Sequence, residues 1–140
     1  MKVISSLDDA KSFINDHKSD ETISLIPTMG NIHSGHLKLI NSASSSSLKI
    51  VSIYVNELQF NDRNDYISYP RTLDDDLSIC ADNNVDLVFT PDSSVVSKKL
   101  DGDKNDLPKF TSYMCGANRS GHFSGVYRLS LIHISEPTRL

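Results

Sequence analysis

Three short apolar runs, separated by segments of helical periodicity, constrain the fold of this chain more than any other feature. The runs are ISLIP (23–27), IVSIYV (50–55) and VDLVF (85–89). Each is compact and rich in β-branched residues, as buried strands are. Because the segments between them carry apolar residues at helical spacing, the order predicts an α/β fold. Its parallel sheet should carry helices on both faces.

Hydroxyl side chains mark the expected helix starts. Ser6 with Asp9, and Thr72 with Asp75, have the three-residue spacing of a capping box, in which each side chain bonds to the other residue's backbone N–H. Ser34 stands where it can cap the helix between the first two runs. We therefore expect helices to begin after positions 6, 34 and 72.

Composition excludes several classes of protein. The net charge of −4, without a cluster of Lys and Arg, argues against nucleic acid as a partner. No stretch approaches the ~20 apolar residues that span a membrane, and the first residues do not resemble a signal peptide, so we expect a cytoplasmic protein. Of the two cysteines, Cys80 falls on an apolar helical face and is interpreted as a small buried hydrophobic residue.

The segment TMGNIHSGH (28–36) follows the first apolar run and is the strongest candidate for chemistry. Ligands of parallel sheets bind at the carboxyl ends of the strands. Gly30 permits a sharp turn there, and Gly35 allows a ligand to approach the backbone. His33 and His36 should point the same way at a helix start, where N–H groups and two imidazoles suit a polyphosphate. A surface pair of histidines is the alternative.

Two amides follow the second run, in VNELQF (55–60). Asn56 and Gln59 can each donate and accept hydrogen bonds, which suits a ligand carrying hydroxyl and carboxylate groups. Alternatively, they cap their own backbone.

No metal site is predicted. The acidic run Asp74–Asp76 suits the first turn of a helix for ordinary dipole reasons, and the two histidines lack further ligands at a familiar zinc spacing. Arg119 and His122, in CGANRSGHF (115–123), lie either in an anion-facing loop or in a simple turn.

Five blocks of the sequence resemble the pantothenate synthetase (pantoate–β-alanine ligase) family. PTMGNIHSGH resembles the family signature PTMG-x-LHxGH, and VSIYVNELQF resembles VSIFVNPxQF. YPRTLDDDL and VDLVFTP match in order and spacing, and CGANRSGHFSGV resembles GASRPGHFxGV. The resemblance implies a Rossmann-like, HIGH-type nucleotide-binding fold, here incomplete.

The family reaction has two steps. Pantoate attacks the α-phosphorus of ATP to give pantoyl adenylate, and β-alanine then displaces AMP to give pantothenate. The resemblance implies ATP with Mg²⁺, pantoate and β-alanine as small-molecule partners, and a homodimer of the full-length enzyme. It makes His36 the catalytic proton donor, and Gln59 and Asn56 substrate-binding residues. The ATP-binding residues would be Met29, Gly30, Asn31, Ile32, His33, Ser34, Gly35 and His36.

The chain departs from the family pattern in three places. The loop from Asp92 to Lys109 lacks the tyrosine–proline pair common in the family. Glu57 stands where the family usually has proline. From about Tyr127 the resemblance stops, and LSLIHISEPTRL looks like translated sequencing-adapter read-through. We therefore expect a partial nucleotide-binding domain over 1–126 and an atypical tail over 127–140, and little or no activity from the 140 residues alone.

Two other functions stay open. A nucleotidyltransferase would use HxGH to transfer a nucleotide to a phosphorylated acceptor. A non-catalytic nucleotide-binding module would bind ATP without releasing pyrophosphate.

Overall fold

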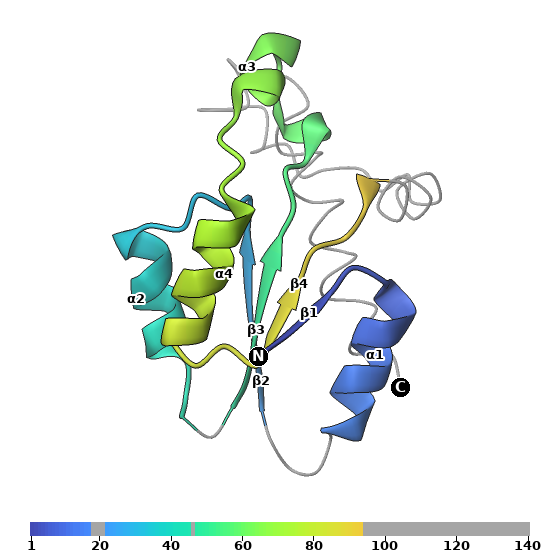
Figure 1. Ribbon diagram of the computed structural model, residues 1–140, viewed down its shortest axis with the longest axis vertical. Coiled ribbons are helices and arrows are strands. Elements are labelled where there is room, and N and C mark those ends of the chain that lie inside the picture. Colours follow the sequence, from blue (N-terminus) through green and yellow to red (C-terminus); the bar gives the residue numbers. More distant parts are fainter. Residues whose placement is uncertain (18–21, 46, 94–140) are drawn as a thin grey trace, which may run out of the picture. The chain divides into compact units, whose positions relative to one another are not determined.

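A single parallel sheet organises the computed structural model, which describes residues 1–17, 22–45 and 47–93. Within these residues its strands are β1 (Lys2–Ile4), β2 (Ile23–Thr28), β3 (Leu48–Ile53) and β4 (Leu87–Phe89), in the order β1-β4-β3-β2 (Figure 1). Ile23 pairs with Leu48 at one end of the β2–β3 ladder, and Thr28 pairs with Ile53 at the other. The three apolar runs are therefore confirmed as strands, and β1 is a further strand ahead of them.

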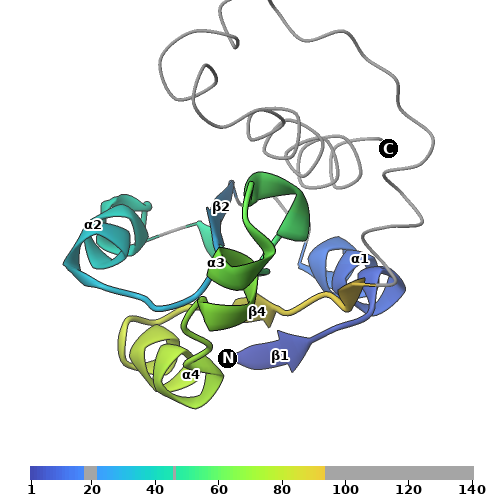
Figure 2. The ribbon, with the colours of Figure 1, turned by 90° about the horizontal axis from the view of Figure 1, so that it is seen from above.

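Three helices cover the sheet on both faces, as predicted. They are α1 (Leu7–Asp16), α2 (Ser34–Ser42) and α4 (Leu73–Asp82). The chain moves along the sheet in one direction from β1 to β2 and in the opposite direction from β2 through β3 to β4. Because crossovers between parallel strands are right-handed, the reversal puts α1 on one face and α2 and α4 on the other (Figure 2).

Two hydrophobic clusters reflect these two faces. On the side of α2 and α4, the buried residues are Ile26, Ile32, Ile40, Val51, Cys80, Val85 and Val88. On the side of α1 they are Phe13, Ile14, Leu48, Ile50 and Leu87. Alternation of neighbours such as Leu87 and Val88 follows from the two-residue period of a strand. Cys80 is fully buried, as expected, and burial, with a smaller contribution from Asp76, raises the pKa of its thiol to about 11.

The first predicted run, 23–27, ends at Pro27, but the strand does not end there. β2 continues to Thr28 and lies at one end of the described sheet. The Thr28 carbonyl accepts the Tyr54 N–H, so even-numbered residues of β2 turn their backbone groups toward β3. Pro27 therefore places its missing N–H on the side away from β3, where no ladder bond is lost.

Of the three predicted capping residues, only Ser6 caps its helix. Ser6 caps α1, its hydroxyl accepting the Asp9 N–H at 3.4 Å. The box of Thr72 with Asp75 is wrong, because Thr72 makes no cap bond and its hydroxyl instead donates to Asp76 at 3.2 Å. Ser34 is the first residue of α2 rather than its cap, and His33 takes the capping position.

The sheet and its helices belong to one unit, residues 1–54 and 70–92, and residues 55–69 belong to a second. The second unit contains a short 3-10 helix, η1 (Glu57–Gln59), and α3 (Arg63–Ser68). The Phe60 ring meets the rings of Tyr66 and Tyr69 edge-on, with centroids 5.6 and 5.5 Å apart. This aromatic group holds the segment together without a strand.

Candidate functional site

The connection from β2 to α2 reverses the chain through two left-handed residues. Gly30 has a φ of 81° and Asn31 a φ of 52°. The Thr28 hydroxyl donates to the Ser52 carbonyl at 3.0 Å and accepts the Gly30 N–H at 3.1 Å, which ties the turn to β3. The turn predicted at Gly30 is confirmed, and its positive φ is the conformation that glycine adopts most readily.

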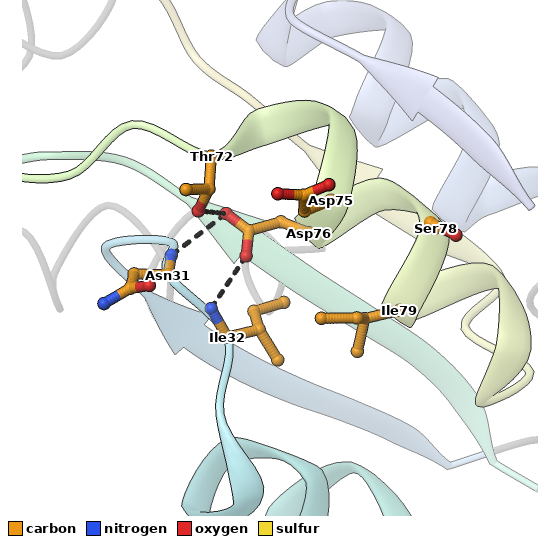
Figure 3. A pocket seen from close by; sticks show the side chains of 7 residues that line it. All are labelled: Asn31, Ile32, Thr72, Asp75, Asp76, Ser78 and Ile79. Atoms are coloured by element: carbon orange, nitrogen blue, oxygen red, sulfur yellow. Dashed lines mark hydrogen bonds between the residues drawn. The ribbon is translucent and has the colours of Figure 1, made fainter.

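Asp76, from α4, holds the far side of this turn. Its carboxylate accepts the Asn31 N–H at 3.0 Å and the Ile32 N–H at 2.7 Å (Figure 3). The side chain is only 1% exposed. A Cβ at Gly30 would lie 2.9 Å from Oδ2 of this carboxylate, so glycine is needed for space as well as for φ.

Sequence reasoning missed this contact, because it interpreted Asp74–Asp76 as ordinary first-turn acids. Asp74 and Asp75 are exposed and fit that interpretation. Asp76 lies four residues before Cys80, on the buried face of α4. A carboxylate on the apolar face of a helix was the available signal, since a buried charge needs partners.

A hollow of about 430 Å³ opens between the turn and α4. Its lining residues are Asn31, Ile32, Thr72, Asp75, Asp76, Ser78 and Ile79 (Figure 3). Neither candidate histidine lines it. The hollow thus marks the α4 side of the turn, whereas the histidines stand at the start of α2.

The two histidines form the cap of α2. The His33 Nδ1 accepts the Gly35 N–H at 3.1 Å, and the His36 Nδ1 accepts the His33 N–H at 3.4 Å. Their ring centroids are 4.2 Å apart, so they lie together as the spacing predicted. When the rings are neutral, both Nδ1 atoms can accept only if the ring protons are on Nε2, which makes each Nε2–H a hydrogen-bond donor.

Gly35 leaves room for the His33 ring. A Cβ at this position would lie 2.9 Å from Cε1 and 3.2 Å from Nδ1 of the His33 ring. The backbone N–H of Gly35 is also occupied by that ring. The close approach expected at Gly35 is therefore made by the capping imidazole.

Electrostatics favour a neutral His36. Partial burial lowers the pKa of its imidazole, and the neighbouring His33 lowers it further, while Asp76 opposes both by raising it. A neutral ring keeps its Nδ1 lone pair for the His33 N–H. Protonation would remove the Nδ1 acceptor and with it the cap bond, whereas Nε2–H is a donor in either state.

The amides predicted after β3 lie in the second unit. Asn56 caps η1, its Oδ1 accepting the Leu58 N–H at 3.2 Å. Asn56 and Gln59 are 1% and 9% exposed. Asn56 is therefore a backbone cap, as the alternative interpretation proposed. The cap bond uses one of the two lone pairs of the amide oxygen.

Some predicted features cannot be placed in the structure. Arg119, His122 and the boundary between 126 and 127 lie outside the described residues.

Within residues 1–17, 22–45 and 47–93, no three or more His, Cys, Asp or Glu side chains gather as metal ligands would. Over the same residues, no helix has the length and apolar character needed to cross a membrane.

The chain matches one protein family along almost its whole length. The family model described as "Pantoate-beta-alanine ligase" matches residues 2–140. A pantothenate synthetase of Leptospira biflexa is 39% identical over 142 residues, covering 98% of this chain and 50% of the relative. One from Thermosipho africanus is 38% identical over 143 residues, covering 99% and 51%. The chain therefore spans about half the length of the curated relatives it matches.

Solved structures show the same fold. A pantoate-beta-alanine ligase from Francisella tularensis, complexed with beta-gamma ATP and beta-alanine, has a TM-score of 0.89 and 33% identity. That match covers 98% of this chain and 53% of the other. A pantothenate synthetase from Thermus thermophilus has a TM-score of 0.73 and 32% identity, covering 94% and 49%. The predicted α/β fold is confirmed.

Proposed function

This chain belongs to the pantoate–β-alanine ligase family, and we propose that it supplies the ATP-binding half of an enzyme that condenses pantoate with β-alanine. In the first step the pantoate carboxylate attacks the α-phosphorus of ATP and pyrophosphate leaves. In the second, the β-alanine amine attacks the activated carbonyl and AMP leaves, giving pantothenate. The Francisella tularensis relative was solved with beta-gamma ATP and beta-alanine, which supports these substrates.

The paired histidine cap carries this proposal. It puts two imidazoles, in the tautomer that donates from Nε2, at the start of a helix and the carboxyl end of a strand. Donors at such a position suit the phosphates of ATP and the charge that develops on departing pyrophosphate. We assign the proton-donating role to His36. Its neutral ring donates a hydrogen bond from Nε2, and transfer of a proton requires the protonated ring, in which Nδ1 no longer accepts the His33 N–H.

The remaining ATP contacts are proposed for Met29–His36. The Asn31 and Ile32 N–H groups already bond to Asp76, and the Gly35 N–H bonds to His33. These three residues would therefore contact ATP through other atoms. Their part is to set the path of the backbone, so that the imidazoles meet the phosphates.

Gln59 and Asn56 are the proposed pantoate residues, with Gln59 also beside β-alanine. Both amides are buried, and buried amides that pair with a ligand discriminate strongly for its hydroxyl and carboxylate groups. This assignment rests on the family resemblance of VNELQF, not on their geometry.

Magnesium is proposed to arrive with ATP. Mg²⁺ commonly binds substrate phosphates and a few carboxylates rather than a full protein cage. The described residues fit this mode better than a resident site, because Asp76 already has three donors on its carboxylate. When bound, the ion would neutralise phosphate charge.

Three further predictions extend this proposal. The complete enzyme should be a cytoplasmic homodimer. A polypeptide limited to these 140 residues should have little or no turnover, since it spans about half of the relatives. Pantothenate formed by the purified 140-residue polypeptide would contradict that expectation.

A chimera tests the function directly. Residues 1–126 of this chain would replace the matching half of the Leptospira biflexa pantothenate synthetase. We expect pantothenate formation and ATP–pyrophosphate exchange that requires pantoate, and loss of both in a His36→Ala chimera. Exchange that requires a phosphate ester would indicate a nucleotidyltransferase. ATP binding by the 140-residue chain, with no exchange by a folded chimera, would indicate a binding module.

A further inference from the structure

The most deeply buried acid of the described chain serves the histidine turn. Asp76 is 1% exposed, and its carboxylate accepts three hydrogen bonds. Oδ1 accepts the Ile32 N–H, and Oδ2 accepts the Asn31 N–H and the Thr72 hydroxyl. An ionised carboxylate only accepts hydrogen bonds, and all three partners are donors. The site is thus matched to a charged Asp76.

The turn has the geometry of an anion-binding nest. The successive N–H groups of Asn31 and Ile32, which follow the left-handed Gly30, point to the same carboxylate. Concave arrangements of successive N–H groups bind phosphate in many proteins. In this chain the anion is the protein's own carboxylate, so the nest anchors the loop.

The anchor is directly upstream of the histidine cap. Ile32, whose N–H donates to Asp76, is followed by His33, the cap residue of α2. The His33 N–H in turn donates to His36 Nδ1. We propose that Asp76 is the positioning residue of the histidine pair. It fixes the backbone ahead of His33 and thereby the placement and tautomer of both imidazoles.

This inference deepens the proposed function and rests on it where ATP binding is concerned. A purely structural Asp76 would alter unfolding alone. A positioning Asp76 also alters the ring tautomers and the ATP affinity of a folded protein. Spectroscopy of the histidines separates the two roles.

The test compares Asp76→Asn with Asp74→Asn in the ¹⁵N-labelled 140-residue chain. Asparagine keeps the shape of aspartate but replaces one acceptor oxygen with a donor that opposes the loop N–H groups. Asp74 is exposed in the same helical turn, so its variant makes the same charge change without touching the loop. The readouts are amide exchange at Asn31 and Ile32, imidazole ¹⁵N shifts, and ATP titration.

In Asp76→Asn we expect the two loop amides to exchange about 10- to 100-fold faster, while those of Val51 and Val88 in the sheet stay protected. His33 and His36 should shift from the Nε2–H tautomer to a mixture, and ATP should bind about tenfold more weakly. Asp74→Asn should leave all three readouts at wild-type values.

Wild-type ring signals and ATP affinity in a folded Asp76→Asn variant would overturn the inference. If the wild-type chain does not bind ATP, the proposed function fails for this chain, and the ring signals and exchange still decide the positioning role. If Asp76→Asn does not fold, Thr72→Val decides instead, because it removes only the hydroxyl donor. That variant should show loop exchange faster by about threefold and a partial tautomer shift, and unchanged signals would overturn the inference.

Discussion

Two connections in this fold each lead from a strand to a helix, but different interactions stabilise them. The connection from β1 to α1 consists of Ser5 and Ser6, and its cap is a local serine hydroxyl. The connection from β2 to α2 contains two left-handed residues, a histidine cap, and a carboxylate from 44 positions further along the chain. The first connection only joins two elements, whereas the second places two imidazoles. The candidate site thus differs from the β1–α1 connection in being held by a residue distant in the sequence.

The largest expected difference concerns Gly30. Gly30→Ala forces a side chain into positive φ and brings its Cβ within 2.9 Å of the Asp76 carboxylate. Strain together with loss of a buried hydrogen bond should lower the free energy of unfolding by about 3 kcal/mol, as measured by urea denaturation. Ser5→Ala, in the short connection, should change it by less than about 0.5 kcal/mol. Equal effects of the two substitutions would remove the contrast between the connections.

The two helix caps give a sharper comparison. Ser6→Ala and His33→Ala each remove a cap and should each lower the free energy of unfolding by about 1 kcal/mol. Only His33→Ala should also weaken ATP binding, by about tenfold, since it removes a donor to a charged phosphate. Calorimetric titration with ATP measures this difference. A matching loss of affinity in Ser6→Ala would show that the effect comes from general destabilisation.

Acid should affect the second connection selectively. Because the pKa of His36 in the fold is lowered below its ordinary value of 6.5, the unfolded chain binds the proton more readily. The contribution of His36 to stability is therefore complete above pH 6.5 and is lost as the pH falls from 6.5 through the folded pKa. NMR titration of the ring should give a midpoint below 6.5. A midpoint above 6.5 would contradict the neutral cap.

A small effect on stability, comparable to that of Ser5→Ala, is expected at Gly35. Alanine improves helix propensity by about 1 kcal/mol relative to glycine, which offsets the displacement of the His33 ring. The free energy of unfolding of Gly35→Ala should thus lie within about 0.5 kcal/mol of the wild-type value. Its Cβ would lie 2.9 Å from that ring, so ATP affinity should still fall by about threefold. Unchanged affinity would mean that the ring position does not matter for binding.

Much of the fold could be predicted because its signals are local. The three apolar runs predicted the strands, and Ser6 predicted the start of α1. The turn at Gly30 and the proximity of the two imidazoles also followed from residue type and spacing. In each case the signal is a residue type or a spacing that can be seen within a few positions of the sequence, although distant contacts also stabilise the strands and the turn.

The capping pattern failed at two of the three predicted helix starts, where spacing alone did not identify the hydrogen-bond partner. Ser34 and the Thr72–Asp75 pair have suitable spacing, yet His33 caps α2 and Thr72 donates to Asp76. The acidic run illustrates the same limit, because Asp74–Asp76 look equivalent in sequence and only Asp76 is buried. Which acid turns inward is set by the packing of α4 on the sheet.

By itself, the sequence determined the alternation of strands and helices, the position of the candidate chemistry after β2, and the family. Only the tertiary structure decided that Asp76 anchors the turn, that Gly35 makes room for an imidazole, and that the Nδ1 atoms of both histidines accept backbone N–H groups. The physical reason is that hydrophobic periodicity and turn propensity depend on residues that are close together in the sequence. A buried carboxylate, in contrast, takes the partners that folding brings to it, here from 44 and 45 positions away.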